Sequence, residues 1–319
     1  MLTKGYCGSS IKRFFEQSCL FFSLGLVLVL VALPALSQAA TPWYSYGRAH
    51  TLTLTPDGKV WALGGNSYGQ LGNGTFGGDS LEPRVVKGLD GVVAALAGGN
   101  HSVALKMDGT VWTWGYNASG QLGNGTTQNS AVPKQVAGLT NVKSIATGSG
   151  HIVALKNDGT VWAWGGNRSG QLGIGGYQDC KTPVQVSGLS GVTEIVAGAY
   201  NTSALKKDGT LMAWGFNGSG QLGNGDNERS SIPVYVSGLK NVRAIAAGDW
   251  HVVALKQDGT VWAWGSNRAS QLGAMTASFS YSPRQVPGIN NVTDITASVG
   301  HTIAIAKNDS VWAWGDAGT

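Results

Sequence analysis

Histidine is the residue of this chain whose spacing most invites a chemical interpretation. Imidazole is a common metal ligand, and the histidines recur at steps of 50 or 51 residues once one exception is counted. They are His50, His101, His151, His251 and His301, and Asn201 occupies the remaining place. A zinc site needs three or four ligands about 2 Å from one ion, whereas one histidine per repeat keeps equivalent residues far apart. We therefore predict no metal site, and expect each histidine to begin a strand and to hydrogen-bond to neighbouring backbone.

Other groups that could do chemistry repeat with the same period. Segments such as Gly-Gln-Leu-Gly-Asn-Gly at 120–125 lack the Gly-Lys-Ser/Thr continuation of a phosphate-binding loop, so their glycines are predicted to form tight turns. A second repeated set is aspartate followed by glycine, which is typical of hairpin turns rather than catalytic carboxylates; it comprises Asp57, Asp108, Asp158, Asp208 and Asp258. No Ser/His/Asp or Cys/His set is visible. The chain is predicted not to be an enzyme and to need no cofactor.

The composition describes an ordered, turn-rich chain. Charged residues make up 12% of the 319 residues and glycine numbers 49, whereas a disordered chain combines low hydrophobicity with high net charge. The formal net charge is +5, and no run of Lys and Arg forms the basic patch typical of nucleic-acid-binding proteins. We expect no nucleic-acid partner.

Residues 1–39 are predicted to be a signal peptide. Lys12-Arg13 precedes an apolar stretch from Leu20 to Leu36, and Ser37-Gln38-Ala39 fits a signal-peptidase site. The apolar stretch is long for a signal peptide, so an uncleaved membrane anchor is the alternative. In both cases residues 40–319 are expected to be extracytoplasmic, in contact with the membrane only if the leader is retained. Cleavage leaves Cys180 as the one cysteine, which excludes an internal disulfide.

One copy of the repeat, between residues 92 and 138, contains four short strand signals. Val92–Ala97 is an apolar run, and His101–Lys106 alternates between the two faces. Asp108-Gly109 predicts a type I′ hairpin, in which both central residues need positive φ. Val111–Trp114 is the third strand and Pro133–Val136 the fourth, with proline at its start because proline cannot donate to a ladder.

Four antiparallel strands per repeat predict an all-β fold, a β-propeller with one four-stranded blade per repeat. The repeats cover about residues 41–90, 91–140, 141–190, 191–240, 241–290 and 291–319, and the last blade is predicted to be incomplete because the sequence stops before its fourth strand. Paired tryptophans in the third strand point to one face, where an indole packs one blade against the next. The residues assigned this structural role are Trp114, Trp164, Trp214 and Trp264.

The repeat also resembles a known family. The pattern His-x-x-Ala-Leu-Lys-x-Asp-Gly-Thr-Val-Trp-Ala-Trp-Gly-x-Asn-x-x-Gly-Gln-Leu-Gly is similar to the repeat of the regulator of chromosome condensation family, over about residues 41–319. The resemblance implies a β-propeller, usually of seven blades. This chain departs from it with six copies, a degraded first copy at Thr41–Tyr46 and a truncated sixth. A six-bladed ring with an incomplete last blade and a truncated fragment both remain open, and an unclosed ring would expose sheet edges.

The candidate interaction surface comes from residues that the copies do not share. Antiparallel order places the Gly-x-x-His and Gly-x-Asn loops on one rim of the propeller and the Asp-Gly turns on the other. The rim residues predicted to bind a partner are Tyr116, Arg168, Tyr200, Phe216, Asp249, Trp250 and Arg268, and Arg48, Tyr68 and Asn100 lie on the same rim. Tyr200 and Phe216 belong to the fourth blade and Trp250 to the fifth, so these three residues are predicted neighbours. Exposed aromatic residues are typical of interface hot spots.

Five variable segments, long enough to reach a partner, extend from the same repeats: residues 75–82, 126–132, 176–182, 226–232 and 274–282. The first hypothesis is a secreted, non-enzymatic module that binds a protein through this rim. The resemblance implies two further points: some secreted bacterial relatives inhibit β-lactamases through such loops, and the family name implies guanine-nucleotide exchange on a small GTPase. Carbohydrate binding is a further alternative, because exposed aromatic rings stack on sugars.

Overall fold

The computed structural model describes residues 3–5, 43–273 and 277–316, and every regular element within them is a β-strand. The leader assigned to residues 1–39 therefore lies outside the described residues, except for Thr3–Gly5. In the described part of the chain, no helix is long and apolar enough to cross a membrane.

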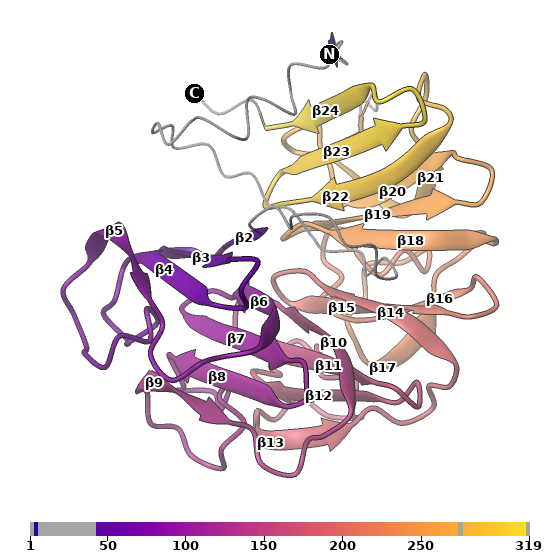
Figure 1. The fold of residues 1–319 in the computed structure, drawn as a ribbon. Helices are drawn as coiled ribbons and strands as arrows, with labels where there is room; N and C mark the ends of the chain where they lie inside the picture. The colour runs from indigo at the N-terminus through magenta and orange to yellow at the C-terminus, as the bar shows by residue number, and fades with distance from the viewer. Residues whose placement is uncertain (1–2, 6–42, 274–276, 317–319) are drawn as a thin grey trace.

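The strands form six antiparallel sheets, each of which is one blade (Figure 1). Blade 1 contains β2 (Trp43–Tyr46), β3 (His50–Leu54), β4 (Val60–Gly64) and β5 (Ser80–Val85). Blade 2 contains β6 (Val92–Ala97), β7 (His101–Lys106), β8 (Val111–Gly115) and β9 (Ser130–Gln135). Blade 3 contains β10 (Val142–Thr147), β11 (His151–Lys156), β12 (Val161–Gly165) and β13 (Cys180–Gln185). Blade 4 contains β14 (Val192–Ala197), β15 (Asn201–Lys206), β16 (Leu211–Gly215) and β17 (Ser230–Tyr235).

Blade 5 contains β18 (Val242–Ala247), β19 (His251–Lys256), β20 (Val261–Ser266) and β21 (Phe279–Gln285), and blade 6 contains β22 (Val292–Ala297), β23 (His301–Ala306) and β24 (Val311–Gly315). The predicted propeller of six repeats is confirmed, and the last repeat supplies three strands. A short strand from near the amino terminus, β1 (Thr3–Gly5), pairs with β24 at the edge that the fourth strand occupies in the other blades. The first strands of successive blades contact one another, so they lie nearest the propeller axis.

The Asp-Gly turns form hairpins, but the predicted type I′ geometry is wrong. Gly109 has a φ of +77° and Asp108 is not among the residues with positive φ. The Gly109 N–H donates to the Lys106 carbonyl at 2.9 Å, and the Lys106 N–H donates to the Thr110 carbonyl at 2.9 Å. This is a three-residue loop with a type I turn followed by a left-handed glycine. The carboxylate of Asp108 accepts the Thr110 N–H and hydroxyl at 3.0 and 2.6 Å, so it caps the turn.

Successive blades are joined by the second tryptophan of the third strand. The buried indole of Trp164 donates its Nε1–H to the carbonyl oxygen of Gln121, in the loop of the preceding blade, at 3.0 Å. The same bond joins the other pairs of successive blades: Trp114 to Gln70, Trp214 to Gln171, Trp264 to Gln221 and Trp314 to Gln271, at 2.8 to 3.0 Å. The prediction that these tryptophans pack blade on blade is confirmed. In blade 6, Trp312 and Trp314 contact the same core cluster, as expected for residues on one face.

The Gly-Gln-Leu-Gly loop is built around this joint. The Gln121 side chain accepts the Ser119 N–H at 2.9 Å, which holds its loop in place while its main-chain carbonyl binds the next blade. Gly123 has a φ of +64°, and a Cβ there would lie 2.8 Å from Nε1 of Trp164. The glycines of this loop are therefore tight-turn residues, as predicted, and this one also makes room for the indole.

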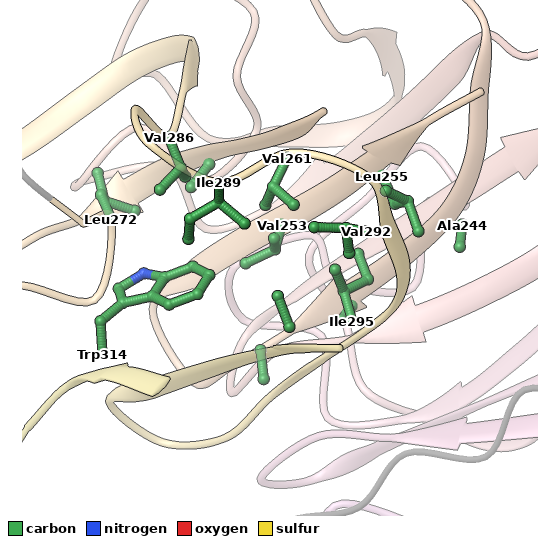
Figure 2. Close-up of a cluster of buried hydrophobic side chains, with 14 residues drawn as sticks. Ala244, Val253, Leu255, Val261, Leu272, Val286, Ile289, Val292, Ile295 and Trp314 are labelled. Atoms are coloured by element: carbon green, nitrogen blue, oxygen red, sulfur yellow. The ribbon is translucent and has the colours of Figure 1, made fainter. Parts of the chain in front are cut away.

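Figure 2 shows the packing between blades 5 and 6. Trp314 lies beside Leu272, Val286 and Ile289, and a layer of valine, leucine and isoleucine side chains extends from it between the two sheets. The corresponding clusters lie between the other blades. The hydrophobic core is thus divided into wedges between successive sheets, because each sheet between two others buries both of its faces.

Blade 6 differs from the others on the face turned away from blade 5. Ile305 is 39% exposed, whereas the equivalent Leu105 and Leu155 are 3% and 0% exposed because the following blade covers them. On blade 1, Leu63 occupies the position of the joining tryptophan. Among the described residues, no tryptophan–carbonyl joint links blade 6 to blade 1. The structure therefore presents six blades in series, with two end faces that lack this joint.

Replacing Trp164 by Phe tests the joint. Phenylalanine keeps most of the buried apolar surface but leaves the Gln121 carbonyl without the indole donor, so the free energy of unfolding should fall by about 1–3 kcal/mol. The measurement is chemical denaturation followed by circular dichroism. The control is Trp162→Phe, because that half-buried indole donates to Thr160 within its own hairpin. An equal or larger loss of unfolding free energy in the control would contradict the role assigned to the hydrogen bond between Trp164 and Gln121.

Candidate functional site

The repeated histidines hold blades together. His101 and His151 begin β7 and β11, as predicted, and both are fully buried. Their partner is not backbone, which corrects the prediction: Nε2 of each lies against a hydroxyl of the next blade. His50 contacts Ser102 at 2.8 Å, His101 contacts Thr147 at 2.8 Å, His151 contacts Thr202 at 3.1 Å and His251 contacts Thr302 at 2.9 Å. His301 begins β23 in the last blade and is only half-buried.

The hydroxyl group that contacts the histidine also donates a hydrogen bond back to the preceding blade. Thr202 donates its hydroxyl hydrogen to the carbonyl oxygen of Gln171 at 2.8 Å, so it must accept the Nε2–H of His151, which fixes the tautomer. Gln171 also accepts the indole N–H of Trp214. One carbonyl oxygen of the preceding blade therefore accepts hydrogen bonds from two side chains of the next blade. The absence of a Cβ at Gly148 is required, because it would meet the His151 ring and the Gly198 carbonyl.

Burial keeps these histidines neutral. It lowers the pKa of His50 and His151 to about 4, and that of His101 and His251 to about 3. In the described residues, no group of three or more His, Cys, Asp and Glu side chains converges on a metal-binding geometry. A role in blade contacts therefore accounts for the histidine spacing.

Asn201 marks a break in this pattern. The residue of blade 5 that corresponds to Thr202 and Thr302 is Val252, which has no hydroxyl to offer. Within the described part of the chain, three buried polar atoms around this junction lack a partner: Asn201 Nδ2, Ser203 Oγ and Gln221 Nε2. The contact between blades 4 and 5 is therefore less completely hydrogen-bonded than its neighbours.

The two loop types lie on one rim, as predicted. Asn201 pairs with Gly215, so the loops that end β14 and β16 emerge at the same end of the sheet. They are also bonded to each other: the Phe216 N–H donates to the Tyr200 carbonyl at 2.9 Å, and the Ser266 N–H donates to the Trp250 carbonyl at 2.8 Å. Between blades, the Ala199 N–H donates to the Asp249 carbonyl at 3.0 Å. These bonds hold the rim loops of blades 4 and 5 as one unit.

Three predicted rim residues form an aromatic cluster, which we call the Trp250 cluster. Trp250 lies 5.6 Å from Tyr200 and 5.7 Å from Phe216 between ring centroids, with planes inclined at 48° and 78°. All three are half-buried. Phe216 extends over Gly218, where a Cβ would lie 2.6 Å from the ring. Their predicted proximity is confirmed.

The other predicted rim residues are distributed around this cluster. Tyr116 does not join it but pairs with Tyr68 across blades 1 and 2, at 4.7 Å between centroids. Arg168 and Arg268 are exposed. Burial raises the pKa of Asp249, and the charge of Arg48 lowers it, so these two residues are electrostatically coupled across the rim.

Several residues of this region were not singled out from the sequence. Arg229 stacks over Tyr177 at 4.3 Å and donates to the Arg168 carbonyl at 3.0 Å, which connects two of the variable segments. Residues 274–276 of the last such segment lie outside the described residues.

Asn217, in the Gly-x-Asn loop, donates to the carbonyls of Asp226 and Glu228 and accepts the Leu222 N–H, so it organises its whole loop. Its recurrence in the first five copies was the available signal.

Glu194, on the inner strand β14, is a further residue that the sequence did not reveal. Burial raises the pKa of its carboxyl to about 7, against a main-chain hydrogen bond from Ile245 that lowers it. The equivalent positions in the neighbouring blades, Ser144 and Ala244, carry no charge. Of these three blades, only blade 4 therefore carries a charged side chain at this position.

Comparison with known proteins identifies similar chains. A family model described as the RCC1-like domain matches residues 29–319. The chain is 47% identical over 87 residues to the Protein RCC2 homolog of Danio rerio and 46% identical over 78 residues to human RCC1 domain-containing protein 1. These matches cover 26% and 24% of the chain but only 17% and 20% of the two relatives.

Solved structures extend the similarity over most of the chain. Yeast RCC1 (Prp20), in its complex with Kap60, superposes with a TM-score of 0.76 at 27% identity, covering 86% of this chain and 70% of that one. Human WBSCR16 superposes with a TM-score of 0.72 at 28% identity, covering 86% and 72%.

Acid should unfold the protein through the buried histidines. Their folded pKa lies below the ordinary value of 6.5, so the unfolded state binds protons first and stability is lost as the pH falls from 6.5 toward 4. Each neutral histidine contributes up to about 1.4 kcal/mol per pH unit in that window. The measurement is the denaturation midpoint as a function of pH. His151→Asn should reduce the slope; an unchanged slope would exclude this histidine as a cause.

The break at Asn201 can be repaired. Asn201→His with Val252→Thr should recreate the imidazole–hydroxyl–carbonyl chain, with the new hydroxyl donating to Gln221. Asn201→His alone buries an imidazole N–H without an acceptor, and Val252→Thr alone adds a hydroxyl that can donate to Gln221 but receives no imidazole donor. The double variant should therefore exceed the sum of the single effects by about 1 kcal/mol. A double-mutant cycle on the free energy of unfolding measures this coupling, and additive effects would contradict it.

Proposed function

The chain belongs to the RCC1-like domain family, and on that footing we propose that it is a non-enzymatic module that binds a protein partner through the loop rim. The Trp250 cluster is the observation that carries this proposal. Aromatic residues dominate interface hot spots, and here three of them occupy positions that the repeat leaves free to vary.

The geometry favours binding because the cluster is already ordered. Main-chain hydrogen bonds join the loops that carry Tyr200, Phe216 and Trp250, within blades and between them. A surface fixed before binding loses little conformational entropy when a partner docks. The rings contact one another and are half-buried, so a partner can cover them at modest further ordering cost.

The absence of catalysis is part of the proposal. The residues best suited to acid–base chemistry, the histidines, are buried between blades and bonded to hydroxyl groups. The hairpin aspartates cap their own turns, as Asp158 does with Thr160. These contacts account for the repeated polar residues without a reaction.

A regulator of a small GTPase is the second candidate. It rests on structural relatives: yeast Prp20p, which is described with its binding to Gsp1p and histones, superposes with a TM-score of 0.75 at 26% identity. The test is release of labelled guanine nucleotide from purified small GTPases. Acceleration by this chain would favour the exchange function over simple binding.

We propose an extracytoplasmic location, supported by Lys12-Arg13, the apolar stretch 20–36 and the Ser37-Gln38-Ala39 site. Removal of the leader would also remove β1, and blade 6 would retain the three strands of its repeat. Fractionation and amino-terminal sequencing of the mature protein test this location, and a cytosolic chain that keeps residue 1 would refute it.

Alanine at Tyr200, Phe216 and Trp250 together should abolish partner capture. Each hot-spot aromatic contributes about 2 kcal/mol or more to an interface, so capture should fall below detection. The measurement is quantitative affinity capture from the native host, with thermal unfolding to confirm an intact fold. The matched control is Tyr235→Ala, because Tyr235 is 65% exposed but lies on the outer strand of blade 4. Unchanged capture by the triple variant would refute the rim assignment, and a glycan as the captured molecule would refute the protein partner.

A further inference from the structure

The Trp250 cluster lies between two arginines at equivalent places in the repeat. Arg168 follows the loop asparagine of blade 3, Gly218 follows that of blade 4, and Arg268 follows that of blade 5. Both arginines are exposed. Along the rim, the order is thus a guanidinium group, the aromatic cluster whose Phe216 extends over Gly218, and a second guanidinium group.

The two arginines beside the cluster, Arg168 and Arg268, are not engaged in ion pairs within the described part of the chain. Arg229 adds a third guanidinium group, which is bound to the carbonyl of Arg168. An exposed arginine without a partner is free to bind an incoming carboxylate through two parallel hydrogen bonds.

The acidic side chains in the same loops are mostly engaged. Asp179 accepts the Asn167 N–H at 2.8 Å. Asp226 accepts the Asn217 side chain at 3.0 Å and the Asn224 side chain at 2.8 Å. Glu228 is exposed. These hydrogen bonds hold the carboxylates of Asp179 and Asp226 within their own loops, and Asp249, beside Trp250, is half-buried. The guanidinium groups of Arg168 and Arg268, by contrast, are exposed on the two sides of the cluster.

We propose that the rim binds an acidic peptide segment with an apolar residue at its centre. Its carboxylates would pair with Arg168 and Arg268, and its apolar side chain would pack on Phe216 and Trp250. This inference rests on the proposed protein-binding function and specifies the chemistry of the partner.

The ring geometry favours a peptide over a single-stranded nucleic acid. Bases stack on successive aromatic faces along a basic groove. In the Trp250 cluster, Phe216 meets Trp250 edge to face at 78° and Tyr200 is tilted by 48°. Such rings cover part of one another's faces and form one compact apolar surface, which suits a single anchoring side chain.

A displayed library of random peptides provides the probe. Peptides are selected on the full chain and counter-selected on the Phe216→Ala/Trp250→Ala variant. The expected result is enrichment of Asp and Glu on both sides of an aromatic or aliphatic residue. Enrichment of neutral or basic peptides that require the cluster would overturn the acidic partner while leaving the proposed function standing. Failure to enrich any peptide over the variant would count against both.

Charge reversal then tests the role assigned to the arginines. For a synthetic peptide from the selection, Arg168→Glu/Arg268→Glu should raise the Kd measured by calorimetry by at least about tenfold, with a weaker dependence on salt. The matched control is Lys207→Glu/Lys307→Glu, which makes the same change in charge on exposed residues of the opposite rim and should leave the Kd within about twofold. Equal losses in both variants, or none in the first, would overturn the proposal. Binding of an oligothymidylate lost in the same variant, with no peptide bound, would overturn it in favour of nucleic acid.

Discussion

The main-chain carbonyl of one glutamine in each of blades 1 to 5 is the contact on which the propeller depends. Gln171 accepts two donors from the next blade, the indole of Trp214 and the hydroxyl of Thr202, and the hydroxyl in turn receives His151. Because these groups are buried, each unpaired member would cost the full desolvation penalty. Glycine, glutamine, tryptophan and histidine therefore recur together: the glycines make space, the glutamine side chain holds its loop, and the other two reach across to the adjacent blade.

The joint between blades also distinguishes the positions that maintain the fold from the rim positions that are free to vary. Positions in the joint are occupied by the same residue types in nearly every copy, while the rim positions beside them differ freely. The Trp250 cluster uses that freedom at the junction where Asn201 replaces the histidine and Val252 replaces the hydroxyl residue. The rim there is held by main-chain bonds between loops, so its order does not depend on the missing imidazole.

Particular residues show which contacts could be predicted from the pattern and spacing of the sequence. The spacing of Trp112 and Trp114 placed both indoles on one face, and the loop order placed Tyr200, Phe216 and Trp250 together; both are confirmed. The type I′ turn at Asp108-Gly109 was wrong because the same dipeptide also ends a type I turn, and the choice depends on the length of the hairpin loop. The assignment of histidine to backbone was wrong because its partner, a hydroxyl of the next blade, lies about one repeat away in the chain.

The sequence by itself determined the repeat, the strand order within a blade, the face of the tryptophans and the edge on which the variable residues gather. These follow from local periodicity and from the fixed alternation of side chains along a strand. Only the tertiary structure decided which blade supplies each hydrogen-bond partner, which rim aromatic residues touch, and that Tyr116 joins Tyr68 rather than Trp250. Such contacts depend on the angle between neighbouring sheets, and that angle is set by the packing of many side chains at once rather than by any short segment.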